Sequence, residues 1–74
     1  MIPEYTKVSI DAYVKDKIPT GGFLYAVLTN NLFEAMSRAD SNNLLAMHDI
    51  CSYIYNNTPS SCWGSPEKVK EWLL

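Results

Sequence analysis

The chain has 74 residues, six of them basic and eight acidic, so its net charge at neutral pH is −2. Nucleic-acid binders usually carry a clustered basic face, and this balance argues against generic DNA or RNA binding. A chain of this length should form one domain, residues 1–74, with a small stability margin. No segment approaches the ~20 apolar residues of a membrane span, and the first residues lack a secretory signal. We therefore expect a cytoplasmic protein that does not bind membranes.

The first helix is predicted over residues 3–16. Pro3 suits a first helical position, and apolar side chains recur at helical spacing at Tyr5, Val8, Ala12 and Tyr13. Proline and two glycines in residues 18–22 then predict a turn. Residues 22–30 are apolar nearly all round, a pattern that fits a buried helix or a buried strand. We expect a helix, because alanine and leucine favour it and no strand-like partner exists.

Two capping clusters predict the next two helices. Asn31, with Glu34 three positions later, predicts a reciprocal cap on a short helix that continues through Ala39. Residues 40–43 predict the start of the longest helix, which should reach about Asn56. The side chains expected on the inner faces of these helices are Leu32, Ala35, Met36 and Ala39, followed by Leu44, Met47, Cys51, Ile54 and Tyr55.

The last helix is predicted over residues 66–73. The Ser65 hydroxyl can cap it, and Pro66 at the first helical position gives up an N–H that would be unpaired in any case. Its apolar residues Val69, Trp72 and Leu73 should dock on the rest of the chain. The sequence thus predicts an all-α fold, a compact bundle of about five short helices.

No catalytic or metal motif is present, so we expect neither an enzyme nor a cofactor or metal site. Zinc needs about four ligands, and the chain offers two cysteines and one histidine. Cys51 and Cys62 could pair if the fold brings them together, but free thiols are favoured in a reducing cytoplasm. His48 has no nucleophile in an activated setting and should be structural or exposed. Glu34 and Asp40 are explained by helix starts rather than by acid–base catalysis.

Four residues are candidates for contact with a ligand or partner. Two glycines lead into a helix, where N–H groups can hold a phosphate, although such pairs also serve turns and close helix contacts. The single arginine could clamp a phosphate or pair with Glu34 or Asp40. A loop tryptophan could stack on a ligand, anchor an interface or cover the core. These candidates are Gly21, Gly22, Arg38 and Trp63.

Six stretches form a pattern over nearly the whole chain, from Ile2 to Leu73. They are PTGGFL (residues 19–24), AVL (26–28), NL (31–32), RAD (38–40) with Asn43, YN (55–56) and CWGSPE (62–67). In this pattern the chain resembles a family of small uncharacterised proteins encoded by bacteriophages and prophages. The resemblance implies an accessory protein in the cytoplasm of the infected bacterium that blunts a host system by stoichiometric binding. Its pattern adds Asn43 to the candidate contact residues.

Our main functional hypothesis is a non-catalytic binder that neutralises a bacterial defence component. The target could be a nucleotide-type signal held by the candidate residues. A monomer this small has little room for a pocket of ~300 Å³, so the signal should lie between subunits of a homo-oligomer. One alternative is an inhibitor that binds a host defence protein through an aromatic surface. Another is a minor enzyme or a structural phage part without a ligand.

Overall fold

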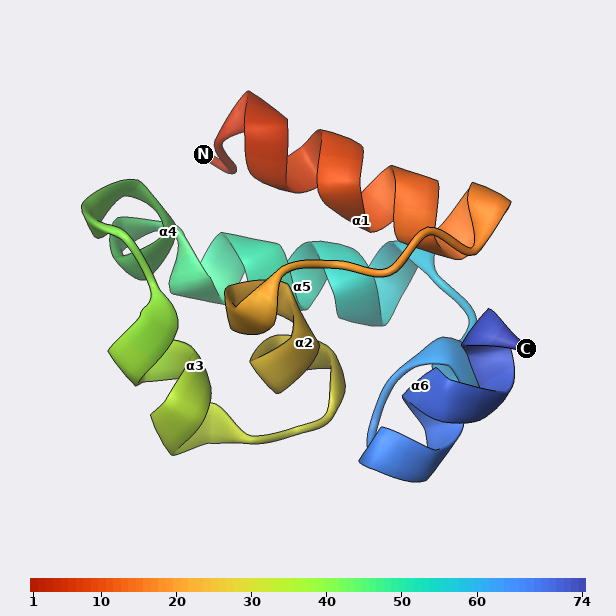
Figure 1. Ribbon diagram of the computed structural model, residues 1–74. Helices are drawn as coiled ribbons and strands as arrows, with labels where there is room; N and C mark the ends of the chain where they lie inside the picture. Colours follow the sequence, from red (N-terminus) through yellow and green to blue (C-terminus); the bar gives the residue numbers. More distant parts are fainter.

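The computed structural model describes all 74 residues and contains helices but no strand, so the predicted all-α class is confirmed (Figure 1). Six α-helices replace the five expected, and a short 3-10 helix, η1, precedes the last of them. The elements are α1 (Glu4–Asp16), α2 (Gly22–Leu28), α3 (Leu32–Arg38), α4 (Ser41–Leu45), α5 (Met47–Asn57), η1 (Ser60–Cys62) and α6 (Pro66–Leu73).

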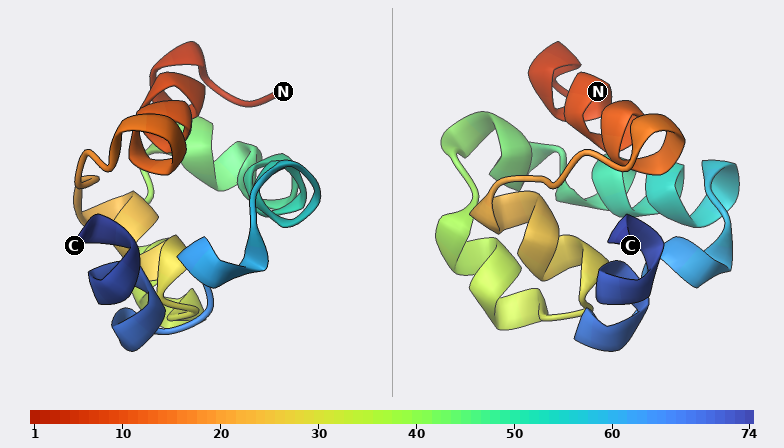
Figure 2. Two further views of the ribbon diagram at one scale, coloured as in Figure 1. Left: turned by 90° about the vertical axis from the view of Figure 1, so that its right-hand side faces the viewer. Right: turned by 45° about the vertical axis from the view of Figure 1, so that its right-hand side comes forward.

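The helices are arranged around α5, which crosses the middle of the molecule. In Figure 1, α1 lies above α5 and runs in the same direction, and the segment after α1 returns across the front before α2 begins. Helices α2 and α3 form a hairpin around a turn at Asn30. The φ of Asn30 is 64°, a left-handed conformation that asparagine tolerates. The two views in Figure 2 show α6 beside the lower end of this hairpin. Every helix therefore has one face toward a shared interior.

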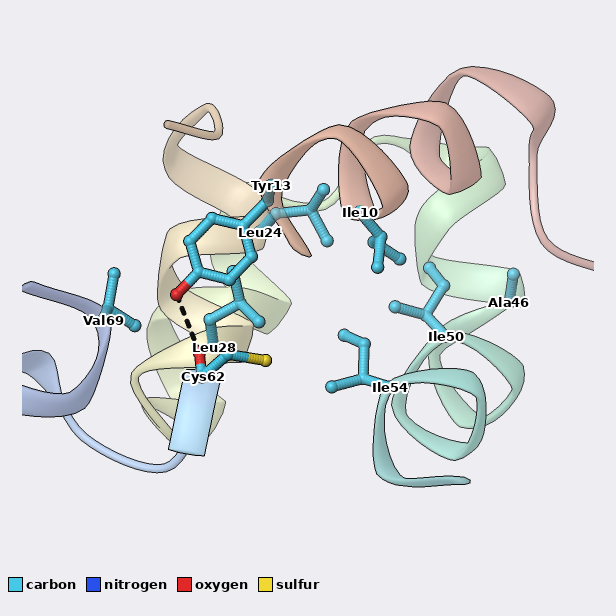
Figure 3. Packing of buried hydrophobic residues seen from close by; sticks show 9 residues of the cluster. All are labelled: Ile10, Tyr13, Leu24, Leu28, Ala46, Ile50, Ile54, Cys62 and Val69. Carbon is cyan, nitrogen blue, oxygen red and sulfur yellow. Dashed lines mark hydrogen bonds between the residues drawn. The ribbon is translucent and has the colours of Figure 1, made fainter. Parts of the chain in front are cut away.

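The core is a single cluster to which nearly every helix contributes. Figure 3 shows its buried members facing one another from α1, α2, α5, η1 and α6. They are Ile10, Tyr13, Leu24, Leu28, Ala46, Ile50, Ile54, Cys62 and Val69. The predicted docking of the last helix is confirmed, because Val69 is buried and Trp72 and Leu73 pack against the cluster.

Tyr13 connects α1 to two distant parts of the chain. Its hydroxyl donates a 2.7 Å hydrogen bond to the backbone oxygen of Cys62, and its own backbone oxygen accepts one of 3.1 Å from Trp72 Nε1. Burial raises the pKa of Tyr13 to about 12. The hydroxyl is therefore a neutral donor at physiological pH, as its carbonyl partner requires.

The predicted inner face of α1 was wrong at two positions. Tyr5 and Val8 are exposed, whereas Thr6 is buried together with Ile10. Thr6 can be buried because its hydroxyl donates a 2.5 Å hydrogen bond to Asn43 Oδ1, 37 residues away. A polar partner from another helix thus decides which face of α1 points inward.

The predicted helix over residues 40–56 is instead two helices, so the longest helix is α1. The chain turns at Ala46, whose N–H bonds to the backbone oxygens of both Asn42 and Asn43 at 3.2 Å. A short 3-10-like turn of this kind separates α4 from α5.

The inner faces expected for α3, α4 and α5 were therefore wrong at several positions. Ala35 and Ile54 are buried as expected, and α5 also buries Ile50. Small alanines fill the positions where helices approach closely, which leaves the larger neighbours outside. The side chains expected inside but found exposed are Leu32, Met36, Leu44, Cys51 and Tyr55.

The predicted helix caps are confirmed where they involve neighbouring residues. Backbone N–H groups three positions later donate to Asn31 at 3.4 Å, to Asp40 at 2.7 Å and to Ser65 at 3.2 Å. The reciprocal half of the Asn31 cap does not form, because the Glu34 carboxylate pairs with Arg38. Local sequence thus fixes where α3, α4 and α6 begin.

Gly64 adopts a backbone conformation that other residues rarely take, with φ of +123°. Its N–H donates a 2.7 Å hydrogen bond to the backbone oxygen of Leu28, which holds the loop against α2. We expect Gly64→Ala to lower the free energy of unfolding by about 1–3 kcal/mol, because a Cβ strains this conformation. Urea denaturation followed by circular dichroism measures the effect.

Gly21→Ala provides the control for Gly64→Ala. Gly21 has an ordinary φ of −72°, and no atom lies within 4 Å of the position that a Cβ would take. We expect this change to alter stability by less than about 0.5 kcal/mol. Equal effects at the two glycines would contradict a special conformational role for Gly64.

Candidate functional site

The two candidate glycines lie between two other candidate contact residues, Arg38 and Asn43, and line a hollow with each of them. Gly21, Gly22 and Arg38 line a cleft of about 380 Å³ between α2 and α3. Arg38 lies directly over Gly22, where an added Cβ would be 2.9 Å from its Nη1 atom. That atom is the far end of a flexible, exposed side chain that can move aside, so the contact does not by itself require glycine at this position.

The charge of Arg38 is already balanced within this cleft. Its Nε donates a 3.1 Å hydrogen bond to the Glu34 carboxylate, which lines the same cleft. Of the two alternatives left open by the sequence, the structure contains the ion pair with Glu34. A phosphate placed here would meet a carboxylate as well as the guanidinium, so the cleft is poorly suited to an anion.

We expect Arg38→Ala to leave the melting temperature almost unchanged. Arg38 and Glu34 are both exposed, and an exposed pair four residues apart on a helix contributes roughly 0.3–0.5 kcal/mol. Thermal denaturation at low and high salt measures this contribution. A loss above about 1 kcal/mol would contradict it and would assign Arg38 a packing role over Gly22.

Asn43 has a structural role that the sequence did not reveal. Its side chain is buried and accepts the hydrogen bond from Thr6, and its backbone N–H caps against Asp40. The Tyr5 hydroxyl also donates to Asp40, at 2.5 Å, and this bond holds the pKa of Asp40 below its usual value and raises that of Tyr5. This network joins α1 to the start of α4. Asn43 also lines a hollow of about 260 Å³ together with Gly21 and Gly22.

The largest hollow in the surface is a groove of about 440 Å³ beside α5, which we call the α2–α5 groove. Val27 from α2 and Ile54 from α5 supply apolar lining, and Tyr55 and Trp63 supply aromatic rings. The remaining lining residues are Asn30, His48, Cys51, Ser52 and Asn56. No lysine, arginine, aspartate or glutamate lines it.

Trp63 is the fifth candidate contact residue, and it lies in this groove rather than near Arg38. Its ring is partly buried against the core cluster, and it also lines the groove, so covering the core and meeting a ligand are compatible roles. The Trp63 and Tyr55 ring centroids are 5.7 Å apart at an interplanar angle of 45°. The Tyr55 side chain is 70% exposed, so this pair presents aromatic surface to solvent.

The Trp63 Nε1 atom is buried and has no hydrogen-bond acceptor in the protein. Trp72 provides the contrast, since its Nε1 is paired with the backbone oxygen of Tyr13. A buried donor without an acceptor costs about 1–3 kcal/mol.

The cysteines are both free, as expected, but Cys51 does not lie on the inner helix face predicted for it. Cys51 is exposed beside the groove, and Cys62 is fully buried in the core. Partial burial raises the pKa of Cys51, which lowers its thiolate fraction and its nucleophilicity. His48, expected to be structural or exposed, lies on the surface. The groove therefore does not combine an activated nucleophile with a base.

Sequence reasoning missed that separate stretches of the chain meet at the groove. Val27, Tyr55, Asn56 and Trp63 belong to three stretches of the pattern described above, AVL, YN and CWGSPE. Their grouping in that pattern was the available signal. The pattern could not indicate that Tyr55 points outward, because the spacing between Cys51 and Tyr55 also suits a buried helix face.

Comparison with protein-family models, with curated proteins and with solved structures finds no match to this chain. The structure contains no group of three or more His, Cys, Asp or Glu side chains that could hold a metal ion. None of its helices is long and apolar enough to span a bilayer. The α2–α5 groove, with its aromatic pair and uncharged polar edges, is thus the candidate functional site.

Proposed function

We propose that this protein is a non-catalytic binding protein, encoded by a phage, that neutralises a component of bacterial defence by stoichiometric binding. The phage context comes from the resemblance of the six sequence stretches. The binding role is supported by the α2–α5 groove, whose volume of about 440 Å³ falls in the range of small-molecule sites. The observation that carries it is the aromatic pair of Tyr55 and Trp63 in the groove lining, of which Tyr55 is largely exposed.

The target that suits this groove best is a nucleotide-type signal. Exposed aromatic rings can stack on a base, and the amide and hydroxyl groups around them can hydrogen-bond to its edges. The cleft beside Arg38 and the α2–α5 groove lie on different faces of α2. Gly22 and Thr29 line the cleft, whereas Val27 and Asn30 line the groove. One subunit therefore does not present Arg38 and Trp63 to the same nucleotide. In a homo-oligomer, a second subunit could supply the contacts to phosphate.

A second candidate function is direct inhibition of a host defence protein. It is favoured by an apolar surface on α3, where Leu32, Phe33 and Met36 are all exposed and Phe33 is 86% exposed. Exposed apolar patches of this kind often mark protein interfaces. A small hollow lined by Leu32, Met47 and Cys51 adjoins the groove, so the two surfaces are continuous.

The decisive experiment is native mass spectrometry of the protein purified from bacteria in which the defence system is active. We expect a complex that contains more than one subunit and a bound small molecule in a fixed ratio. A co-purifying host protein would support the second candidate instead. A chain without any bound component, and without effect on defence in cells that express it, would contradict both and favour a structural phage part.

A further inference from the structure

We propose that an extended, uncharged peptide segment of a partner protein binds in a hollow between α1 and the start of α2. This hollow, which we call the α1–α2 hollow, has a volume of about 260 Å³, and Asn43 of α4 forms part of its wall. It shares no lining residue with the α2–α5 groove. Peptide binding here is therefore a further activity that does not depend on what the groove binds.

The Asn43 side chain supplies a hydrogen-bond donor for such a segment. Asn43 is 6% exposed, and its amide oxygen accepts the hydrogen bond from Thr6. Its amide nitrogen donates to no atom of the protein, yet it is not fully enclosed, because Trp63 Nε1 is the only enclosed polar side-chain atom that lacks a partner. The accessible edge of Asn43 therefore lies at the hollow that this residue lines, with two N–H bonds free for an acceptor.

The lining of the α1–α2 hollow is polar but uncharged. It contains no lysine, arginine, histidine, aspartate or glutamate side chain, so a phosphate or carboxylate would meet no cation. The Ser9 hydroxyl makes no hydrogen bond within the protein and can accept one from a ligand. A free donor and a free hydroxyl suit a neutral group that carries both C=O and N–H. A peptide main chain presents this pair at every residue except proline.

Gly21 and Gly22 form one wall of the hollow from backbone alone. They also line the cleft of about 380 Å³ beside Arg38, so the two spaces adjoin at these glycines. No atom lies within 4 Å of the position that a Gly21 Cβ would take, which leaves the passage between them open. The hollow alone is smaller than the ~300–1,000 Å³ of sites that enclose a whole small molecule. An extended chain can instead cross the glycines, where backbone approaches backbone closely, and occupy both spaces.

The test is an NMR titration of the isotope-labelled full chain with a blocked tetra-alanine peptide. Recognition of the main chain requires no particular side chain, and blocked ends leave this probe uncharged. We expect saturable shifts at millimolar peptide in the side-chain amide signals of Asn43 and the backbone amide signals of Gly21 and Gly22. The indole signal of Trp63, in the groove, should stay in place. Absence of a saturable shift at Asn43, or an equal shift at Trp63, would overturn the proposal.

Three variants make the titration specific. Gly21→Leu places a side chain where the two spaces adjoin, and it should weaken binding by more than about tenfold with little change in melting temperature. Ser9→Ala should weaken binding about fivefold, the effect of one neutral hydrogen bond. Ser37→Ala is its matched control, because Ser37 is exposed on α3 and lines neither space. Unaltered binding by Gly21→Leu, or equal effects of the two serine changes, would contradict the peptide site.

A second titration with adenosine 5′-monophosphate distinguishes the hollow from the groove. We expect the nucleotide to leave the Asn43 side-chain signals in place, whether or not it shifts those of Tyr55 and Trp63. A nucleotide that shifts Asn43 where the peptide does not would assign the hollow to the nucleotide, and the peptide proposal would then be wrong. Failure of the peptide alone leaves the proposed function standing, because the groove is a separate site.

Discussion

Replacing Tyr13 with alanine should lower the free energy of unfolding by about 3–5 kcal/mol, as large aromatic truncations in cores do. Tyr13 has no exposed surface, and its hydroxyl pairs with the buried backbone oxygen of Cys62. The variant would contain a cavity at the centre of the core and a carbonyl without its donor. Small domains have total stabilities of about 5–15 kcal/mol, so much of this one's margin would be lost. Denaturation by urea, followed by circular dichroism, measures the change.

Two other variants divide this effect into its parts. Tyr13→Phe removes the hydroxyl alone, and we expect it to cost about 1–3 kcal/mol because the Cys62 oxygen stays buried. Phe33→Ala truncates an aromatic side chain that is 86% exposed, and we expect a change below about 0.5 kcal/mol. If Tyr13→Ala were as mild as Phe33→Ala, the central position of Tyr13 would be disproved.

Replacing Ile50 with alanine should lower the free energy of unfolding by about 2–5 kcal/mol. Ile50 is fully buried and faces α1 across the core, beside Ile10 (Figure 3). It belongs to the core cluster that joins α1, α2, α5, η1 and α6, so a cavity at this position would weaken the packing of several elements. Equilibrium urea unfolding again gives the value, with the slope compared between the variant and the parent to confirm two-state behaviour.

Leu45→Ala is the matched control for Ile50→Ala. Leu45 ends the neighbouring helix α4 and is 89% exposed, so its truncation should change stability by less than about 0.5 kcal/mol. A large loss at Leu45, or a negligible one at Ile50, would show that the inward face of this segment is rotated from the one described.

The start of each helix was largely predictable because a cap depends on residues three positions apart. Asn31, Asp40 and Ser65 cap their helices through neighbours in the sequence, and Pro66 occupies the first position of α6 as expected. The turn predicted over residues 18–22 likewise lies between α1 and α2, which are separated by residues 17–21. Features of this kind need no knowledge of the tertiary structure.

The inward faces were less predictable because they depend on distant partners. Thr6 is buried through Asn43, and the turn at Ala46 changes the register between α4 and α5. Nothing in the local spacing of apolar residues indicates either fact. Cys51 and Tyr55 were assigned to the core together with Ile54 for this reason, whereas the structure buries Ile50 and Ile54.

Of the residues that line the candidate site, only Trp63 was among the contact residues predicted from the sequence. The sequence singled out Trp63 as a loop aromatic and Arg38 as the lone arginine, and their separation by α2 became visible only in the fold. Asn43 was taken for a contact residue and is a buried structural partner of Thr6. The unpaired state of Trp63 Nε1 depends on which backbone oxygens surround it, which no sequence pattern encodes.

The bonds of Tyr13 also bear on how the chain folds during its synthesis. Its hydroxyl pairs 49 residues downstream and its backbone oxygen 59 residues downstream, so α1 has no native partner for these groups until Cys62 and Trp72 have been made. The first helix should therefore wait for these later segments before it reaches its final packing. Folding of this domain is then a late, concerted event rather than a stepwise one along the chain.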